Sequence, residues 1–309
     1  MSVARAPGKL VLSGAYSVLE GAPAIVAAVD RYAVADSALP ARVITSEVAA
    51  AVKRGLLRRA VGFDASALRE LLADGDSRKL GLGSSAAILV ASLAAEALDA
   101  GVDEGALGAH VFPDALACHR RAQGGGSGVD VAASAFGGVL ACRLDAALCT
   151  EAGAGLTVAP HTLPTGLLVE TWLSPEVSST AGMLARIRHF AASPANSYGA
   201  HLEVASGGAE AARVATTVAE LVVALTNQWG ALAALGHDAG VPIFSPAASE
   251  LACVAAECNA AFGPAGAGGG DVAIYLGGEP SGERFRHLAQ RRGFRPLALA
   301  LGASGVGIG

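Results

Sequence analysis

The parts of this sequence that could do chemistry are glycine-rich segments with a charged or hydroxylated residue beside them. Three such segments stand out, at Gly81–Ser85, Gly124–Gly128 and Gly266–Gly270. Asp130 closely follows the second segment, and Lys9 lies near the N-terminus in the sequence Pro-Gly-Lys-Leu-Val-Leu. Only 16% of the residues are charged. A lysine and an aspartate among glycines and valines are therefore candidates for binding an anionic group and for acting on it.

The first segment leads into an apolar stretch, residues 84–98, with helical periodicity. A helix that begins there directs free backbone N–H groups and the positive end of its dipole at the preceding loop, which suits a phosphate. A tight turn with Ser84 as an ordinary N-cap explains the same residues without a ligand. No Gly-Lys-Ser/Thr follows, which excludes a Walker A loop, and the polar residues before Gly81 argue against a dinucleotide-binding fingerprint.

The other candidates also have simpler explanations. Asp130 could cap a helix or a turn, Gly266–Gly270 could be a flexible turn before a strand, and Lys9 could be an exposed residue at the end of a strand. The residue types alone leave these alternatives open.

The elements that would position these residues predict an α+β fold. Short strands are expected from Leu10 onwards, broken at Gly14 and at 21–23, with later strands at 136–144, 166–173 and 272–276. Helices are expected at 84–98, 113–122, 179–190, 208–235, 247–261 and 281–292. A polar, Gly/Ala-rich stretch at 145–164 is the candidate boundary, which gives domains at 1–160 and 161–309.

Composition excludes several classes of protein. The net charge of −5 argues against a nucleic-acid partner. Hydrophobic residues make up 52%, but the most apolar stretch, Ala86–Ala95, is about half of the roughly 20 residues that a membrane span needs. No membrane association and a cytoplasmic location are expected. The five cysteines show no disulfide or zinc spacing and are interpreted as buried thiols.

Three motifs occur in an order that resembles the GHMP kinase superfamily of small-molecule kinases. They are PGKLVLSGAYSVLEG at 7–21, KLGLGSSAA at 79–87 and GPAGAGGGDVAIYLG at 263–277, and they extend across nearly the whole chain. The resemblance implies an S5-like N-terminal domain followed by a ferredoxin-like C-terminal domain. Within the superfamily, CHRRAQGGGSGVDVAASAFGG at 118–138 and TWLSPEVSST at 171–180 are most similar to the phosphomevalonate kinase branch.

The resemblance implies particular cofactors and particular site residues. ATP and Mg²⁺ are the expected cofactors, with Ser84 and Ser85 offering hydroxyls to the metal. Lys9 and Asp130 are expected to face the phosphoryl group that is transferred. The residues expected to bind ATP are Lys79, Gly81, Leu82, Gly83, Ser84, Ser85 and Ala86. Those expected to bind the acceptor are Ser127, Gly128, Ser178, Ser179, Thr180, Gly266, Ala267, Gly268 and Gly269.

The acceptor that this branch implies is 5-phosphomevalonate, which would become 5-diphosphomevalonate, in a monomer or homodimer. A phosphomonoester is mostly dianionic at pH 7 and needs no base, so Lys9 would screen the repulsion between two anions while Asp130 orients Lys9 or the metal. Ala15, His119 and Ala265 depart from the superfamily's usual residues. Two alternatives stay open: a kinase that acts on a hydroxyl, such as a mevalonate kinase, and a non-catalytic sensor of a nucleotide or metabolite.

Overall fold

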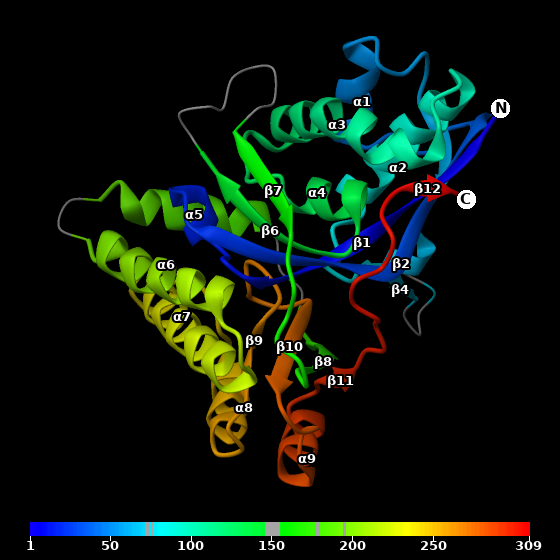
Figure 1. The fold of residues 1–309 in the computed structure, drawn as a ribbon. Helices are drawn as coiled ribbons and strands as arrows, with labels where there is room; N and C mark the ends of the chain where they lie inside the picture. The colour runs from blue at the N-terminus through cyan, green and yellow to red at the C-terminus, as the bar shows by residue number, and fades with distance from the viewer. Residues whose placement is uncertain (72–74, 76, 146–154, 177–179, 194–195) are drawn as a thin grey trace. The chain divides into compact units, whose positions relative to one another are not determined.

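A computed structural model of residues 1–309 describes the chain except at 72–74, 76, 146–154, 177–179 and 194–195. The chain forms two compact units (Figure 1). The first unit comprises residues 1–10, 26–161 and 299–309, and the second comprises 11–25 and 162–298. The last residues of the chain thus belong with the first unit.

A six-stranded sheet and the helices packed on it build the first unit. The strand order is β12-β1-β2-β6-β7, with β3 paired to β2. The strands are β1 (Val3–Ser13), β2 (Pro23–Pro40), β3 (Val61–Asp64), β6 (Val139–Leu144), β7 (Leu156–Pro160) and β12 (Gly307–Ile308). The ends of β1 and β2, at 11–13 and 23–25, are counted with the second unit. A separate two-stranded ribbon is formed by β4 (Arg69–Leu71) and β5 (Ser77–Lys79).

Four α-helices of the first unit pack on one another: α1 (Ser46–Lys53), α2 (Ser84–Asp99), α3 (Leu107–Gln123) and α4 (Val129–Phe136). The 3-10 helices η2 (Ser66–Leu68) and η3 (Glu104–Ala106) lie in the connections. Twelve of the 16 residues of α2 are buried, and many of them are alanines, so neighbouring helices can approach closely. The helix at 84–98 is confirmed, and the one predicted at 113–122 begins earlier, at Leu107, with Pro113 inside it.

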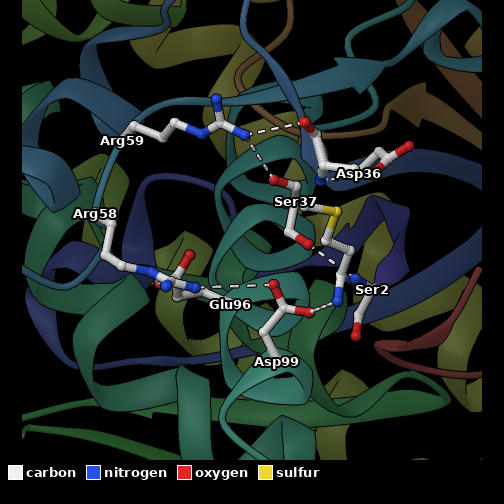
Figure 2. A network of polar contacts seen from close by, with 9 residues as sticks. Ser2, Asp36, Ser37, Arg58, Arg59, Glu96 and Asp99 are labelled. Atoms are coloured by element: carbon white, nitrogen blue, oxygen red, sulfur yellow. Dashed lines mark hydrogen bonds and ion pairs between the residues drawn. The ribbon is translucent and has the colours of Figure 1, made fainter.

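A polar network ties the C-terminal end of α2 to the start of β1, as Figure 2 shows. The N-terminal amine of Met1 pairs with Asp99 at 2.8 Å, and the Ser2 N–H donates to the Ser37 hydroxyl at 2.8 Å. Arg58 pairs with both Glu96 and Asp99. Arg59 donates to the backbone carbonyl of Ser37. Because β1 carries Lys9 and α2 begins at the first glycine segment, this network helps to fix the two elements that hold the candidate site.

The second unit contains a four-stranded antiparallel sheet with the order β11-β8-β10-β9. Its strands are β8 (Leu168–Leu173), β9 (Ala261–Pro264), β10 (Val272–Gly277) and β11 (Arg295–Pro296). Its helices are η1 (Ser17–Glu20), α5 (Thr180–Ala191), α6 (Tyr198–Val214), α7 (Val218–Asp238), α8 (Pro246–Ala256) and α9 (Glu283–Arg291). In its core the Phe285 ring meets Trp172, Phe262 and Tyr275 edge to face, with centroids 5.0–5.5 Å apart.

In the second unit, two of the predicted helices are wrong in extent. The helix predicted at 208–235 is two helices, α6 and α7, because Thr217 and Glu220 form a capping box that starts a new helix. The helix predicted at 247–261 ends at Ala256, and β9 begins at Ala261. Among the described residues, α7 is long and apolar enough to cross a membrane. Half of its apolar window is buried and it packs against α6, so it serves as a core helix.

The expectation that the cysteines are buried holds only in part. Cys118 and Cys142 are buried, whereas Cys253 and Cys258 are exposed, because they lie on the outer side of α8 and in the turn that follows it. Cys149 lies outside the described residues.

Candidate active site

The first glycine segment forms a loop that ends at the N-terminus of α2. Gly81 and Gly83 both have φ of 73°, in the left-handed region that glycine adopts most easily. Gly83, not Ser84, is the N-cap residue, and it has no side chain with which to accept the first N–H groups of the helix. The interpretation of Ser84 as an N-cap is therefore wrong. The first turn of α2 keeps its N–H groups and its dipole available for an anion.

Lys9 contacts this loop through both its backbone and its side chain. Its backbone N–H donates to the Leu82 carbonyl at 2.9 Å, and its Nζ donates to the Gly81 carbonyl at 3.2 Å. A Cβ on Gly8 would lie 2.7 Å from the Leu82 oxygen, so the close approach of β1 to the loop requires glycine there. The Pro-Gly-Lys sequence thus places a cation directly on the phosphate-type loop.

Asp130 lies in the first turn of α4 and comes close to the same loop. Its Oδ1 accepts from the Val131 N–H at 3.0 Å, and its Oδ2 lies 3.2 Å from Nε2 of His119. A Cβ placed on Gly83 would lie 3.0 Å from Cγ of Lys9 and 3.6 Å from Cβ of Asp130. The structure therefore brings Lys9, Gly83 and Asp130 together, although they lie far apart along the chain.

The charges around Asp130 hold it ionised. Burial acts to raise the pKa of Asp130, but the His119 imidazole, Lys9 and the Val131 N–H outweigh burial and hold that pKa well below its usual value. For His119, burial acts to lower the pKa, and the Asp130 and Glu47 carboxylates outweigh it, so the net pKa is raised. The carboxylate of Asp130 is consequently a weak base and a strong partner for cations.

Two further residues brace this arrangement, and the sequence did not indicate this role for either of them. Glu47 is buried, accepts a hydrogen bond from Gln123 Nε2, and interacts electrostatically with His119. Arg120 donates from Nε to the Gly126 carbonyl at 3.3 Å and from Nη2 to the Ser127 carbonyl at 3.1 Å, so it holds the second glycine segment. Glu47 stands in the first turn of α1, where an acidic residue is ordinary, and its sequence gave no signal of another role.

A cavity of about 1210 Å³ opens beside the first glycine segment within the first unit. Lys79, Ser84 and Ser85 lie in its wall, together with Glu47 and Gln123. Most of the remaining wall comes from residues between 34 and 46 and between 62 and 69, among them Arg42, Phe63 and Arg69. No motif marks these two stretches, so the sequence did not single them out. The cavity is large enough for a nucleotide-sized ligand.

The third glycine segment lies in the second unit, between β9 and β10. The Tyr16 hydroxyl donates to the Ala267 carbonyl at 2.6 Å, and the Gly269 N–H donates to the Ile243 carbonyl at 3.1 Å. A Cβ on Gly268, whose φ is 82°, would lie 2.2 Å from that Ile243 oxygen. Glycine is therefore required for this loop to fold against its own unit. This requirement supports the interpretation of the segment as a turn before a strand.

The site residues predicted from the sequence are divided between the two units. Lys9, Lys79, Gly81–Ala86, Ser127, Gly128 and Asp130 all belong to the first unit, and Gly266–Gly269 belong to the second. Ser178 and Ser179 lie outside the described residues, and Thr180 is the first residue of α5.

The donors near the loop fit Mg²⁺ only as an ion held largely by a ligand's phosphates. In the described part of the chain, no cluster of three or more His, Cys, Asp or Glu side chains could hold a metal. The hydroxyls of Ser84 and Ser85 lie at the start of α2, whereas the carboxylate oxygens of Asp130 are engaged by His119 and Val131. This set suits a small ion that keeps its waters and phosphate ligands.

Comparison with solved structures establishes the fold first. No protein-family model matches the sequence. The structure of a Lin0012 protein from Listeria innocua matches with a TM-score of 0.80 at 22% identity, over 99% of both chains. The phosphomevalonate kinase of Streptococcus pneumoniae in complex with phosphomevalonate and AMPPNP matches with a TM-score of 0.70 at 20% identity, over 97% of this chain and 100% of the other. These matches establish the α+β fold of GHMP kinases.

A relative found by its amino-acid sequence adds to the comparison of structures. A phosphomevalonate kinase from Streptomyces sp. (strain CL190) is 28% identical, and the alignment covers 98% of each chain. Together with the fold and the three motifs, this relative confirms the resemblance of the chain to the GHMP kinase superfamily.

Proposed function

We propose that this protein transfers the γ-phosphoryl group of ATP to the phosphate of 5-phosphomevalonate and so forms 5-diphosphomevalonate. The observation that carries the proposal is the cluster of Lys9, Gly83 and Asp130 at the start of α2, beside a cavity of nucleotide size. The named relative at 28% identity supports the choice of acceptor.

In this mechanism the loop and the first turn of α2 bind the phosphates of ATP through backbone N–H groups. Magnesium, when bound with the nucleotide, neutralises charge on its phosphates, with Ser84 and Ser85 as the hydroxyl donors on this chain. Lys9 lies against the same loop and screens the repulsion between the two anions. An oxygen of the acceptor phosphate attacks the γ-phosphorus, the bond to the bridging oxygen breaks, and ADP leaves.

Asp130 acts in this scheme as an anchor for cations and not as a base. A hydroxyl acceptor has a high pKa and benefits from a general base near neutral pH, which an aspartate with a strongly lowered pKa supplies poorly. A phosphomonoester is already ionised at pH 7 and needs no proton removed. The electrostatics of Asp130 therefore favour the phosphate acceptor over the hydroxyl.

The test is a coupled assay of ADP release with Mg-ATP against phosphomevalonate, mevalonate, homoserine and galactose. We expect turnover with phosphomevalonate, and activity confined to mevalonate would overturn the proposal. Nucleotide binding by calorimetry without ADP release for any acceptor would instead favour a sensor.

A matched pair of lysine variants tests the role of the site. Lys9→Met should abolish most turnover, whereas Lys53→Met should leave it unchanged because Lys53 is exposed at the end of α1. A Lys9→Met protein with normal turnover would contradict the mechanism.

A further inference from the structure

A row of groups with alternating charge runs through the helices of the first unit. Lys9 is followed by Asp130 on α4, then by His119 on α3, and then by Glu47 on α1. Helix α3 packs directly against both α1 and α4, which is what brings the last three side chains together. The mechanism above uses Lys9 and Asp130, and it leaves His119 and Glu47 without a role.

His119 is an unusual group to bury. It is 6% exposed, and its Nε2 lies 3.2 Å from Oδ2 of Asp130. Its Nδ1 is buried and has no hydrogen-bond partner among the described residues. An imidazole with one unsatisfied nitrogen is costly unless electrostatic attraction offsets the cost. Two carboxylates, Asp130 and Glu47, supply that attraction, and Arg120 is the one cation that opposes it among the groups acting on His119.

Glu47 is fixed by neutral donors. Its Oε1 accepts from Gln123 Nε2 and its Oε2 from the Ser46 hydroxyl at 3.1 Å. Burial acts to raise the pKa of Glu47, but these hydrogen bonds and the charge of His119 leave it lowered. A buried carboxylate held in this way needs a cation, and His119 is the one that acts on it. Glu47 also lines the cavity, so the row of charges extends from the cavity wall to Lys9.

We propose that His119 is a positioning residue for phosphoryl transfer: as an imidazolium between Asp130 and Glu47 it holds the Asp130 carboxylate in place, so that Lys9 stays on the glycine loop. The proposal rests on the proposed function. Without the imidazolium, Asp130 keeps only Lys9 as a cationic partner and draws it from the Gly81 carbonyl, and the buried Glu47 loses the cation that acts on it.

The kinetic test removes the charge and keeps a hydrogen-bond donor. His119→Gln can still donate an amide N–H towards Asp130, so a merely structural role would survive it. We expect kcat to fall by about tenfold or more with little change in KM for either substrate, because positioning acts on the transferred group. His110→Gln is the control, since His110 is exposed on the same helix. Wild-type kcat in His119→Gln would overturn the proposal.

A second variant tests the balance of charge. Glu47→Gln added to His119→Gln removes the buried carboxylate that has lost its cation. It should restore part of the lost kcat and part of the thermal stability lost in His119→Gln. If the imidazole acts only by filling space, Glu47→Gln adds nothing, and this result would also overturn the proposal. Rescue of this kind is a coupling that independent sites do not show.

A third measurement does not depend on activity or on the folding of variants. The ring C–H resonances of the histidines, followed by NMR in the unliganded wild-type protein, should include one whose pKa is raised above the ordinary histidine value. This resonance should be missing in His119→Gln, and the midpoint of its titration should move to lower pH in Glu47→Gln. A His119 that stays neutral throughout would overturn the proposal even if kinase activity is found. A titrating His119 without ADP release for any acceptor would support this charge row and refute the proposed function.

Discussion

Gly83 should be the most sensitive backbone position in the candidate site. The perturbation is a single added methyl group, Gly83→Ala. It would place a Cβ 3.0 Å from Cγ of Lys9 and 3.2 Å from Cε, closer than an ordinary contact of 3.4–4 Å. The neighbouring atoms belong to the lysine that we place on the phosphates, so the methyl group displaces the candidate catalytic cation by a few tenths of an ångström.

The added methyl group has two effects, one on stability and one on the rate of turnover. An alanine at φ of 73° costs roughly 1–2 kcal/mol of stability because of its left-handed backbone. The displacement of Lys9 adds a cost in rate. A 1 Å error in position can cost about 10²-fold, so a shift of a few tenths of an ångström corresponds to about tenfold in kcat, or about 1.4 kcal/mol in the barrier.

Gly101→Ala separates these two effects. Gly101 follows the other end of α2, has φ of 86°, and has nothing within 4 Å of the Cβ position. Thermal unfolding should show a similar fall of a few degrees for both variants. The ADP-release assay should show a loss of about tenfold in kcat for Gly83→Ala alone. Equal kcat in the two variants would refute the placement of Lys9 against Gly83.

Three further outcomes are expected. Gln228→Leu should destabilise the second unit by about 2–3 kcal/mol in urea unfolding. The reason is that the buried Gln228 Oε1 accepts from the Gly14 N–H and lies 3.3 Å from the Ser13 hydroxyl. An unchanged urea midpoint would contradict this prediction. Phe63→Ala, in the cavity wall, should weaken ATP binding by about tenfold in calorimetry with kcat unchanged, since it removes uniform binding. Asp130 and Glu47 have folded pKa values below their ordinary 3.8 and 4.5, so their stabilising contribution is complete above those values and is lost as the pH falls through the folded ones. Asp130→Asn and Glu47→Gln should therefore flatten the acid limb of stability against pH, and an unchanged limb would contradict the lowered pKa values.

Local chemistry explains which parts of the fold could be predicted. The start of α2 was predictable because a glycine segment and an apolar helical period adjoin in the sequence. The division between α6 and α7 was also readable, since Thr217 and Glu220 have the spacing of a capping box, but alanine-rich residues on both sides favoured one continuous helix.

Long-range packing explains what could not be predicted. Glu47 reaches His119 only because α1 packs on α3, and their positions differ by 72 along the chain. The cavity wall at Arg42 and Phe63 depends on the pairing of β2 with β3, whose register shifts between Asp36 and Pro40. Neither contact has a sequence signature, because each is decided by the surface of another element.

The same row of charges limits what chemistry this site can support. A carboxylate is a more effective base at neutral pH when its surroundings raise its pKa towards 7, and His119 and Lys9 act on the pKa of Asp130 in the opposite direction. A hydroxyl acceptor would gain less from Asp130 as a base than it would from a carboxylate of ordinary pKa. An acceptor that arrives already ionised needs no base and benefits from every cation in the row. Under the proposed function, the preference for an ionised acceptor is therefore linked to His119, a residue that need not contact the acceptor at all.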